Sequence, residues 1–319
     1  MTHTIDKNKA PSTADRNTRF KIFYQEQLVD LGALTFFHHH LLPNGTPWLS
    51  LAKIDSCYLL RYNNLLDVMF DPKKREIHYY PTTNLDQISI DHLIADQVLP
   101  LIHSFYGLTH VHASAVVIQI PYEHASEKHN QEVIAFIGDT GQGKSTLTAS
   151  LCRVGYPVFT DDCLALEESH GHIIGYPGNS TLRLWSDSVD FLYGEVGVEF
   201  QTVAQYTTKK RVNLNEVHGK FFKESAPIRR IYFLDNSADR DSDPEIEITP
   251  LSPKQAFIEL FTHAFRLDIT DKERLRQEFD ILTQISLYPI FFRLSYPRDY
   301  SRLADVQQAI LQHAMRETQ

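Results

Sequence analysis

Residues 133–147 constrain the fold of this chain more than any other stretch. An apolar run at 133–137 leads into a glycine-rich loop, and an amphipathic segment follows the loop. Residues 138–145 fit the pattern G-x-x-x-x-G-K-S/T, a P-loop that binds nucleotide phosphates between a strand and a helix. Glycines let backbone N–H groups turn toward the phosphates, and the helix N-terminus adds a positive dipole end. The sequence therefore predicts nucleotide binding by Gly138, Asp139, Thr140, Gly141, Gln142, Gly143, Lys144, Ser145 and Thr146.

A pair of carboxylates follows this loop one helix later. The short apolar stretch 157–160 is predicted to be a strand, and it ends in Asp161 and Asp162. In a P-loop, the lysine, here Lys144, contacts the β- and γ-phosphates, and the hydroxyl, here Ser145, ligates Mg²⁺. A carboxylate at the end of a neighbouring strand typically binds Mg²⁺ or its water. Because successive strand residues point to opposite sides, the two carboxylates are expected to have different roles.

The short spacing between the two motifs narrows the class of protein. Only one helix separates Lys144 from Asp161. In many P-loop NTPases the metal-linked Asp comes much later in the chain. The compact layout therefore argues against a motor, a GTPase or a transporter ATPase.

Composition excludes several further classes. The net charge is −9, so no overall basic field attracts nucleic acid. The three cysteines, Cys57, Cys152 and Cys163, lack metal-type spacing and indicate reduced thiols in the cytoplasm. No apolar run approaches the roughly 20 residues that span a bilayer, and the polar N-terminus is unlike a secretory signal. We therefore expect a cytoplasmic protein without nucleic-acid or membrane partners, and the sequence leaves room for a homo-oligomer.

The N-terminal part is predicted to be a small β-rich domain, residues 19–108, after a disordered tail at 1–18. Strands are expected at 56–62 and 76–80, and a connector helix with Pro100 inside it is expected at 91–106. The run His38-His39-His40 could supply metal ligands. No second ligand cluster accompanies it, so a strand or turn is the favoured interpretation.

Residues 109–319 are predicted to form the catalytic domain, an α/β unit with C-terminal helices. Polar loops are expected at 122–131 and 236–245. Helices are expected at 144–154, after Ser252-Pro253, after a capping box at Thr270-Asp271-Lys272-Glu273, and at 301–316. Strands are expected at 111–120, 133–137, 157–160, 227–234 and 288–295.

Three motifs resemble the catalytic core of HPr kinase/phosphorylase. They are His112-Ala113-Ser114-Ala115-Val116, the loop at 138–145, and Val158-Phe159-Thr160-Asp161-Asp162. They occur in the family's order and at comparable spacing over residues 110–165. The resemblance is closer still to HPr-kinase-related proteins encoded beside bacterial peptide (lasso-peptide type) and polysaccharide biosynthesis genes, some of which phosphorylate a serine of a precursor peptide. It implies a P-loop kinase core of the HPr-kinase/PEP-carboxykinase-like type.

The resemblance also implies a role for each matching residue. Asp161 matches the carboxylate that takes the proton from the acceptor serine. Asp162 matches its neighbour on the metal and phosphate side, so Asp162 and Ser145 are expected to hold Mg²⁺. Ser145 matches the metal ligand, and Lys144 matches the phosphate clamp. His112 matches a histidine close to the carboxylates, where contact with an Asp would tune and orient the base; a core histidine is the alternative.

One segment departs from the family. HPr kinases carry a glycine-rich signature with a Glu and an Arg downstream of the Asp pair, but residues 175–185 read GYPGNSTLRLW and lack the Glu. The departure argues against HPr as the substrate and against reverse phosphorylase activity. Arg183 is a candidate phosphate contact, with a surface salt bridge as the alternative. Lys210 and Arg211, in a basic cluster at 207–214, are candidates to offset phosphate charge, with a solvated loop as the alternative.

The sequence thus predicts a kinase that uses ATP and Mg²⁺ to phosphorylate a serine hydroxyl of a peptide or small protein. Two alternatives stay open. One is a kinase of a small-molecule hydroxyl, such as a sugar or sugar acid. The other is a nucleotide-gated binding protein in a biosynthetic complex. A carboxykinase-like reaction is more distant, because it needs a further metal-binding Lys or His set that the sequence does not reveal.

Overall fold

The computed structural model describes residues 20–26, 33–82, 84–120, 130–197, 199–235 and 245–316. The predicted tail at 1–18 lies outside the described residues, as do nearly all of the predicted loops at 122–131 and 236–245. The described chain combines helices with large sheets, so the mixed α/β character that the sequence predicts is confirmed.

The chain divides into two compact units. The first comprises Met1–Tyr106, Ala204–Tyr206 and Arg266–Leu275, and the second comprises Gly107–Val203, Thr207–Phe265 and Arg276–Gln319. The sequence predicted a single division after residue 108. It did not anticipate that two later segments return to the first unit.

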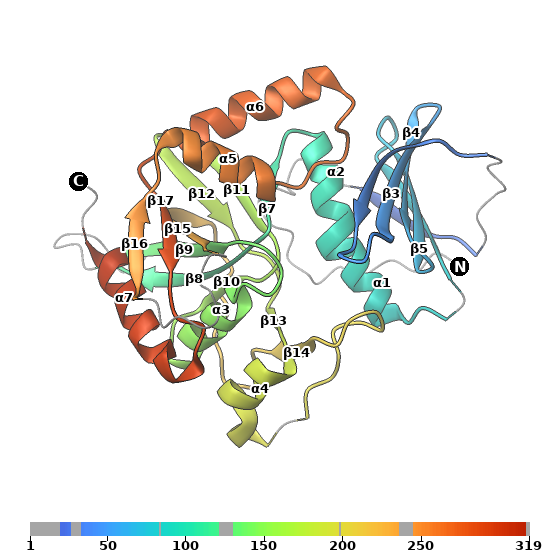
Figure 1. The fold of residues 1–319 in the computed structure, drawn as a ribbon. Coiled ribbons are helices and arrows are strands. Elements are labelled where there is room, and N and C mark those ends of the chain that lie inside the picture. Colours follow the sequence, from blue (N-terminus) through green and yellow to red (C-terminus); the bar gives the residue numbers. More distant parts are fainter. Residues whose placement is uncertain are drawn as a thin grey trace. The chain divides into compact units, whose positions relative to one another are not determined.

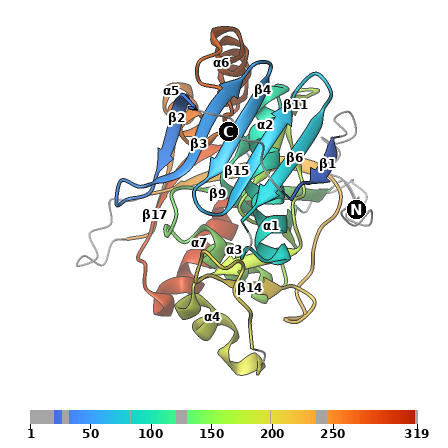
Figure 2. The ribbon, with the colours of Figure 1, turned by 90° about the vertical axis from the view of Figure 1, so that its right-hand side faces the viewer.

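In the described part of the first unit, six strands form one sheet in the order β1-β6-β5-β4-β3-β2. β1 pairs with β6 in parallel, and the other neighbours are antiparallel. β4 and β6 confirm the strands predicted at 56–62 and 76–80. Figure 2 looks onto this sheet, with β1 and β2 at its edges. The bounds are Lys21–Tyr24 (β1), Phe36–Leu41 (β2), Pro47–Ile54 (β3), Cys57–Tyr62 (β4), Leu66–Asp71 (β5) and Glu76–Pro81 (β6).

The histidine run lies on the edge strand β2. The rings of His38 and His40 lie on one side, with centroids 4.6 Å apart, and His39 Nδ1 lies 2.8 Å from Ser50 Oγ. No group of three or more His, Cys, Asp or Glu side chains that could hold a metal occurs within the described part of the chain. Because the run lies within β2, the strand interpretation is confirmed.

The predicted connector helix begins earlier than expected and contains a π turn. It consists of α1 (Gln87–Leu93), a π-helical turn at Ile94–Val98, and α2 (Leu99–Phe105). Asp86 fixes the start, because its carboxylate accepts a hydrogen bond from the backbone N of Ser89 at 2.8 Å. Pro100 lacks an N–H and crowds the preceding turn, so the widened turn allows the helix to continue past it.

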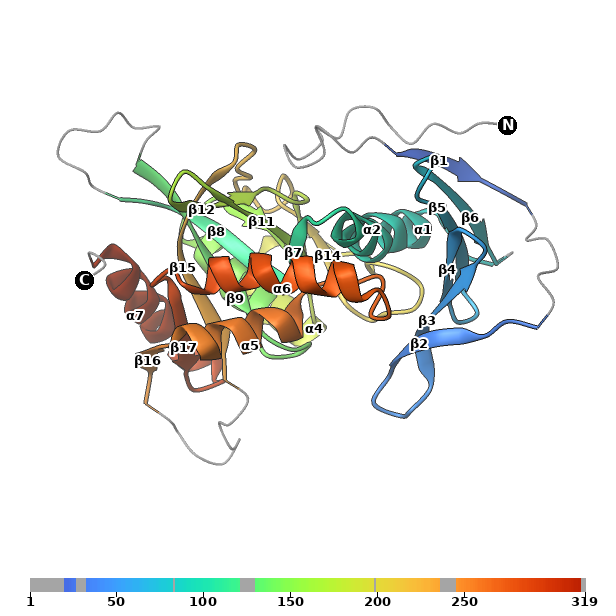
Figure 3. The ribbon, with the colours of Figure 1, turned by 90° about the horizontal axis from the view of Figure 1, so that it is seen from above.

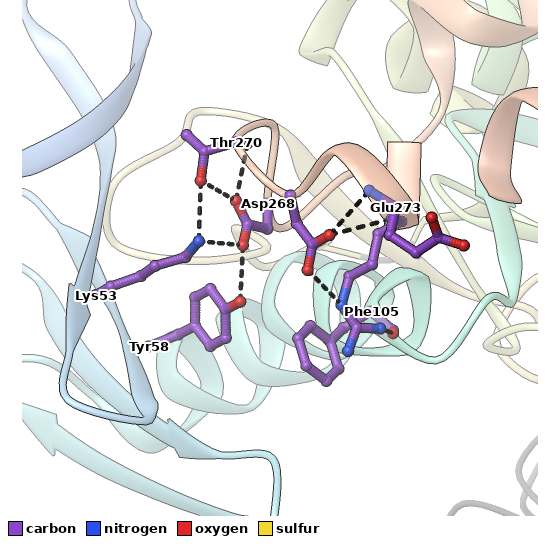
Figure 4. A network of polar contacts seen from close by, with 8 residues as sticks. Lys53, Tyr58, Phe105, Asp268, Thr270 and Glu273 are labelled. Carbon is purple, nitrogen blue, oxygen red and sulfur yellow. Dashed lines mark hydrogen bonds and ion pairs between the residues drawn. The ribbon is translucent and has the colours of Figure 1, made fainter. Parts of the chain in front are cut away.

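A buried carboxylate ties the returning segment Arg266–Leu275 to the first unit (Figure 4). Asp268 accepts hydrogen bonds from Lys53 Nζ and Tyr58 Oη, both at 2.7 Å, and from the backbone N and hydroxyl of Thr270. Its side chain is 1% exposed. Burial alone would raise the pKa of Asp268, but the hydrogen bonds outweigh burial and lower the pKa to about 2. The charged carboxylate thus joins β3, β4 and the returning segment.

Within the described residues, nine strands form the main sheet of the second unit. Seven of them follow the order β10-β8-β9-β15-β12-β11-β7, and β17 pairs with β15 and β16. Two further strands, β13 (Thr181–Leu184) and β14 (Lys210–Asn213), pair with each other. The bounds in the main sheet are Thr109–Val111 (β7), Ala113–Gln119 (β8), Gln131–Ile137 (β9), Val158–Thr160 (β10), Leu164–Ser169 (β11), His172–Tyr176 (β12), Ala226–Leu234 (β15), Glu247–Pro250 (β16) and Phe291–Ser295 (β17).

Three sequence predictions after residue 107 need correction. The single strand predicted at 111–120 is interrupted at His112, and its two parts, β7 and β8, pair with different strands. The strand predicted at 288–295 begins only at Phe291. The capping group before α6 is Asp271 rather than Thr270, because the Asp271 carboxylate accepts from the backbone N of Glu273 and of Arg274. The hydroxyl of Thr270 donates a hydrogen bond to the Asp268 carboxylate instead.

Helices cover both faces of this sheet (Figures 1 and 3). Alternate residues of β8 and β9 enter two separate cores, as a strand with two buried faces requires. One core contains Val116 and Phe136 with α3, α4 and α7; the other contains Val117 and Ala135 with α5 and α6. None of the described helices is long and apolar enough to cross a membrane. The helices are α3 (Lys144–Arg153), α4 (Ser186–Tyr193), α5 (Pro253–His263), α6 (Lys272–Ser286) and α7 (Leu303–Met315).

The strand directions bring the ends of several strands to one edge of the main sheet. β9, β15 and β17 are parallel, and β8 is antiparallel to both β9 and β10, so β10 runs in the direction of β9. The carboxyl ends of β9, β10, β15 and β17 therefore meet the amino end of β8 at the same edge. In sheets of this kind, ligands bind at the carboxyl edge.

Candidate active site

The glycine loop, residues 138–143, connects β9 to α3. It follows a buried strand and ends at Gly143, the residue that precedes α3. Lys144 Nζ donates hydrogen bonds to the carbonyl oxygens of Gly138 at 2.6 Å and Asp139 at 3.0 Å, so this side chain spans the loop. Gln142 Oε1 accepts from the backbone N of Asp139 at 2.7 Å. The predicted order of strand, loop and helix is confirmed.

The predicted nucleotide-binding residues differ in exposure. Asp139, Thr140 and Gly141 form the exposed tip of the glycine loop, whereas Gln142 and Lys144 are buried. The hydroxyl of Thr146 lies 3.0 Å from the hydroxyl of Ser188 on α4, so the Thr146 side chain is engaged within the fold. Its backbone N–H, in the first turn of α3, keeps the direction that favours an anion.

Asp161 is the buried centre of the site. Its carboxylate accepts hydrogen bonds from the hydroxyl of Ser145 at 2.8 Å, from the hydroxyl of Ser114, and from the backbone N of Arg183 at 2.7 Å. The residue is 1% exposed. Burial and the neighbouring charge of Asp162 raise the pKa of Asp161, while the two hydroxyls and Arg183 oppose this rise. Hydrogen-bond donors from α3, from β8 and from β13 thus converge on one carboxylate.

Asp162 lies in a different environment from its neighbour. Its backbone has φ of 74°, in the left-handed region that costs a non-glycine residue about 1–2 kcal/mol. Its carboxylate forms an ion pair with the guanidinium of Arg183, and the side chain is 17% exposed. Backbone strain of this kind collects at functional sites when the surroundings hold it in place. The carboxylate pair therefore consists of one enclosed and one accessible group.

His112 contacts the Asp pair through the backbone rather than through a carboxylate. Its Nδ1 lies 3.0 Å from the carbonyl oxygen of Asp162, and because a carbonyl only accepts, Nδ1 carries the hydrogen. The ring packs on Phe265 with centroids 4.4 Å apart. Burial lowers the pKa of His112 to about 4, so the ring is neutral at physiological pH. It is placed to hold the strained backbone of Asp162.

The predicted cations divide into two groups. Arg183 lies at the Asp pair, and its guanidinium contacts Asp162 rather than standing free for a phosphate. Arg211 is directly opposite Arg183 in the β13–β14 ladder, and opposite residues share a face, so Arg211 is on the site side. Lys210 is opposite Leu184, which is buried in the core, so Lys210 is on the other face.

Lys209 belongs to the basic cluster at 207–214, but only Lys210 and Arg211 of that cluster were named as candidates from the sequence. Its Nζ lies 5.4 Å from the centre of the Trp185 ring, which directly follows β13. Burial is the main cause that lowers the pKa of Lys144, and the positive charge of Lys209 lowers it further. The nearby carboxylates act in the opposite direction and raise this pKa. Lys209 is therefore near enough to act electrostatically on the glycine loop.

Ser114 was also missed, although a signal for it exists. It lies two residues after His112, and in the strand predicted at 111–120 residues two apart would share a face. Both point to the Asp pair, Ser114 through the Asp161 carboxylate and His112 through the Asp162 carbonyl. Tyr296 and Arg298, which contact the glycine loop, gave no sequence signal, because only the pairing of β17 with β15 brings them to this edge.

The donor set fits a Mg²⁺ ion that is bound together with phosphates. Ser145 Oγ and an Asp161 oxygen lie 2.8 Å apart, which offers two hard oxygen donors side by side. The described residues hold no cluster of three or more His, Cys, Asp or Glu, so a cage made of protein alone is absent among them. Mg²⁺ in nucleotide sites commonly binds one or two carboxylates plus phosphate oxygens and water.

The comparisons with known proteins give little further guidance. No protein family matches the sequence, and no curated protein matches it. A solved structure, that of the Hpr(Ser) kinase/phosphatase from Coxiella burnetii, is similar with a TM-score of 0.35 and 12% sequence identity. The similarity covers 64% of this chain and 89% of that chain. So remote a likeness does not define the function of this chain.

Proposed function

We propose that this protein is an ATP- and Mg²⁺-dependent kinase that phosphorylates a serine hydroxyl of a peptide or small protein. The observation that carries the proposal is the hydrogen bond of 2.8 Å between Ser145 and Asp161, because it joins the glycine loop to the carboxylate pair. The proposal includes a P-loop core like that of HPr kinases, which the three sequence motifs resemble, and a location in the cytoplasm.

Asp161 and Ser145 are the residues that we propose to hold Mg²⁺. Their oxygens are adjacent, and Asp161 is enclosed on its other sides by Ser114 and the backbone of Arg183. Mg²⁺ bound there would offset charge on the β- and γ-phosphates. This is the reverse of the division expected from the sequence, in which Asp162 held the metal.

Asp162 is then the group that we propose to position and deprotonate the acceptor. Its side chain is 17% exposed, whereas Asp161 is 1% exposed, so Asp162 is the more accessible carboxylate for an incoming hydroxyl. The serine oxygen forms a bond to the γ-phosphorus as the bond from that phosphorus to the β–γ bridging oxygen breaks. ADP leaves with that electron pair, and the serine proton passes to the Asp162 carboxylate. His112 and Arg183 orient this carboxylate.

Positive charge around the glycine loop supports the same reaction. Transfer of a phosphoryl group needs little covalent chemistry from the protein and depends on alignment and charge stabilisation. Lys144 lies across the loop, and the charge of Lys209 acts on it. Both are available to offset charge on the transferred group and on the leaving phosphate.

The test is phosphoryl transfer from γ-labelled ATP by the full chain with Mg²⁺. Serine peptides and a panel of hydroxylated metabolites are offered in parallel, and the labelled product is identified by mass spectrometry. Asp162→Asn and Lys144→Met are compared with the wild type, and nucleotide binding is measured for each. We expect label on a serine peptide, with loss of transfer but retained nucleotide binding in Asp162→Asn. Label on metabolites alone, or tight ATP binding without transfer to any acceptor, would overturn the proposal.

A further inference from the structure

The segment that follows β17 contacts the glycine loop from outside. β17 runs parallel to β15, and β15 runs parallel to β9, so the residues after Ser295 emerge at the edge where the loop lies. The phenol of Tyr296 donates a hydrogen bond to the carbonyl oxygen of Gln142 at 3.0 Å. Tyr296 is 7% exposed, so this bond is shielded from water.

The environment of Tyr296 keeps its phenol as a hydrogen-bond donor. Burial raises the pKa of Tyr296 to about 12, and the charge of Arg298 only partly opposes this effect. The hydroxyl therefore retains its hydrogen throughout the physiological range. The Gln142 carbonyl can only accept, so the direction of the bond is fixed.

Gly143 makes room for this hydroxyl. A Cβ atom added at Gly143 would lie 2.4 Å from Tyr296 Oη, closer than side chains can approach. Gly143 also has φ of 96°, a conformation that favours glycine. The loop backbone and the phenol are thus in direct contact at the start of α3.

Arg298 provides a second contact from the same segment. Its guanidinium lies 3.4 Å from the carbonyl oxygen of Gly141 and donates to the carbonyl oxygen of Asp235 at 3.0 Å. Asp235 follows β15, so Arg298 connects the residue after β15 with the glycine loop at this edge. Two successive carbonyls of the glycine loop are therefore turned toward residues 296–298.

The direction of the Gln142 carbonyl determines the direction of the next N–H. The peptide bond between Gln142 and Gly143 is trans, like every peptide bond among the described residues. Its C=O and N–H therefore point to opposite sides. With the carbonyl held by Tyr296, the N–H of Gly143 points away from Tyr296. In a loop of this kind, inward N–H groups are the phosphate ligands.

We propose that Tyr296 is a positioning residue that holds the Gln142–Gly143 peptide so that its N–H faces the nucleotide phosphates. This inference rests on the nucleotide binding in the proposed function, but not on transfer to serine. It assigns to the nucleotide site a residue that lies 154 positions after the loop residue it holds.

Tyr296→Phe is the decisive variant, because it removes one hydroxyl and keeps the ring. Calorimetric titration with MgADP and MgATP is expected to show affinity about fivefold to tenfold weaker than wild type, the size expected for one buried hydrogen bond. In the transfer assay the KM for ATP rises by a similar factor, while kcat at saturating ATP stays within twofold. Arg298→Met is expected to weaken binding less, because its contact with Gly141 is longer and exposed.

Tyr300→Phe is the matched control. The Tyr300 hydroxyl bonds to Ser188 and Asp187 and makes no contact with the glycine loop, so nucleotide affinity is expected to stay at the wild-type value. Equal affinity of Tyr296→Phe and wild type, or equal losses in Tyr296→Phe and Tyr300→Phe, would overturn the inference. So would a wild type that binds no nucleotide, whereas nucleotide binding without transfer contradicts only the proposed function.

A double-mutant cycle provides an independent measurement. Gly143→Ala places a methyl group against the Tyr296 hydroxyl, and Tyr296→Phe removes that hydroxyl. We expect the loss of MgADP affinity in the double variant to be smaller than the sum of the two single losses. Strict additivity would show that the phenol does not act on the loop at Gly143.

Discussion

The hydroxyl of Ser145 donates a hydrogen bond of 2.8 Å to the carboxylate of Asp161, sixteen residues further along the chain. Ser145 lies in the first turn of the helix after the glycine loop, and Asp161 directly follows the edge strand β10. The bond therefore connects the two sequence motifs that suggested a kinase. It also separates the roles of the two carboxylates, because Asp162 turns to Arg183 instead.

Variants of the two carboxylates are expected to behave differently. Asp161→Asn weakens the proposed metal site, so the Mg²⁺ concentration for half-maximal transfer should rise about 10- to 100-fold. Asp162→Asn removes the proposed base, so kcat should fall about 10²- to 10⁴-fold with an unchanged Mg²⁺ requirement. Initial rates over a Mg²⁺ series at saturating ATP measure both effects. The opposite pattern would restore the division of roles expected from the sequence.

Replacement of His112 is expected to affect turnover without affecting nucleotide affinity. His112→Ala loses the donor that holds the Asp162 carbonyl, and a single hydrogen bond of about 1–1.5 kcal/mol corresponds to roughly a tenfold loss of kcat. His112→Asn can present an amide N–H near the same position and should retain more activity. Steady-state kinetics and MgADP titration check this. Equal kcat in His112→Ala and wild type would contradict a positioning role.

The ionisation of Asp268 is expected to contribute to stability above about pH 4. The pKa of this carboxyl falls from 3.8 to about 2 on folding, and at about 1.4 kcal/mol per unit the contribution is about 2 kcal/mol. Because the folded-state pKa is the lower one, the contribution is complete above the unfolded pKa and is lost as pH falls from about 4 to 2. Asp268→Asn should therefore destabilise the protein at pH 7 by about this amount, measured by urea unfolding.

Glu76→Gln is a suitable control for this measurement. Glu76 pairs with Lys21, whose side chain is 71% exposed, and such pairs contribute little to stability. Its loss should cost less than about 1 kcal/mol. If Asp268→Asn were as stable as wild type, the buried hydrogen bonds of Figure 4 would have no net effect on folding.

The sequence predicted local elements well, because their signals are local. The glycine loop, the helix start at Ser252-Pro253 and the strands β4, β6 and β15 follow from residue patterns within a few positions. The interruption at His112 did not follow from such a pattern. Before His112, β7 pairs with β11, and after it β8 pairs with β9 and β10. No property of residues 111–113 alone reveals this change of partners.

The candidate site was predicted in part for the same reason. The loop, the Asp pair and the nearby His112 were named from sequence, and the structure places them at one edge of the sheet. The division of roles between the carboxylates depends on the left-handed backbone of Asp162 and on burial of Asp161, which are tertiary properties. Tyr296 reaches the loop only through parallel pairing of strands that are far apart in sequence.

The order in which the chain visits its two units has a consequence for dissecting the protein. It passes between them at 106–107, 203–204, 206–207, 265–266 and 275–276. A protease that cuts once after residue 106 would therefore leave part of the first unit covalently attached to the second. A truncated chain starting at residue 107 would retain Asp268 but lack Lys53 and Tyr58, the side chains that satisfy its carboxylate. The N-terminal sheet cannot be removed as a separable module without exposing an acidic group that the fold buries.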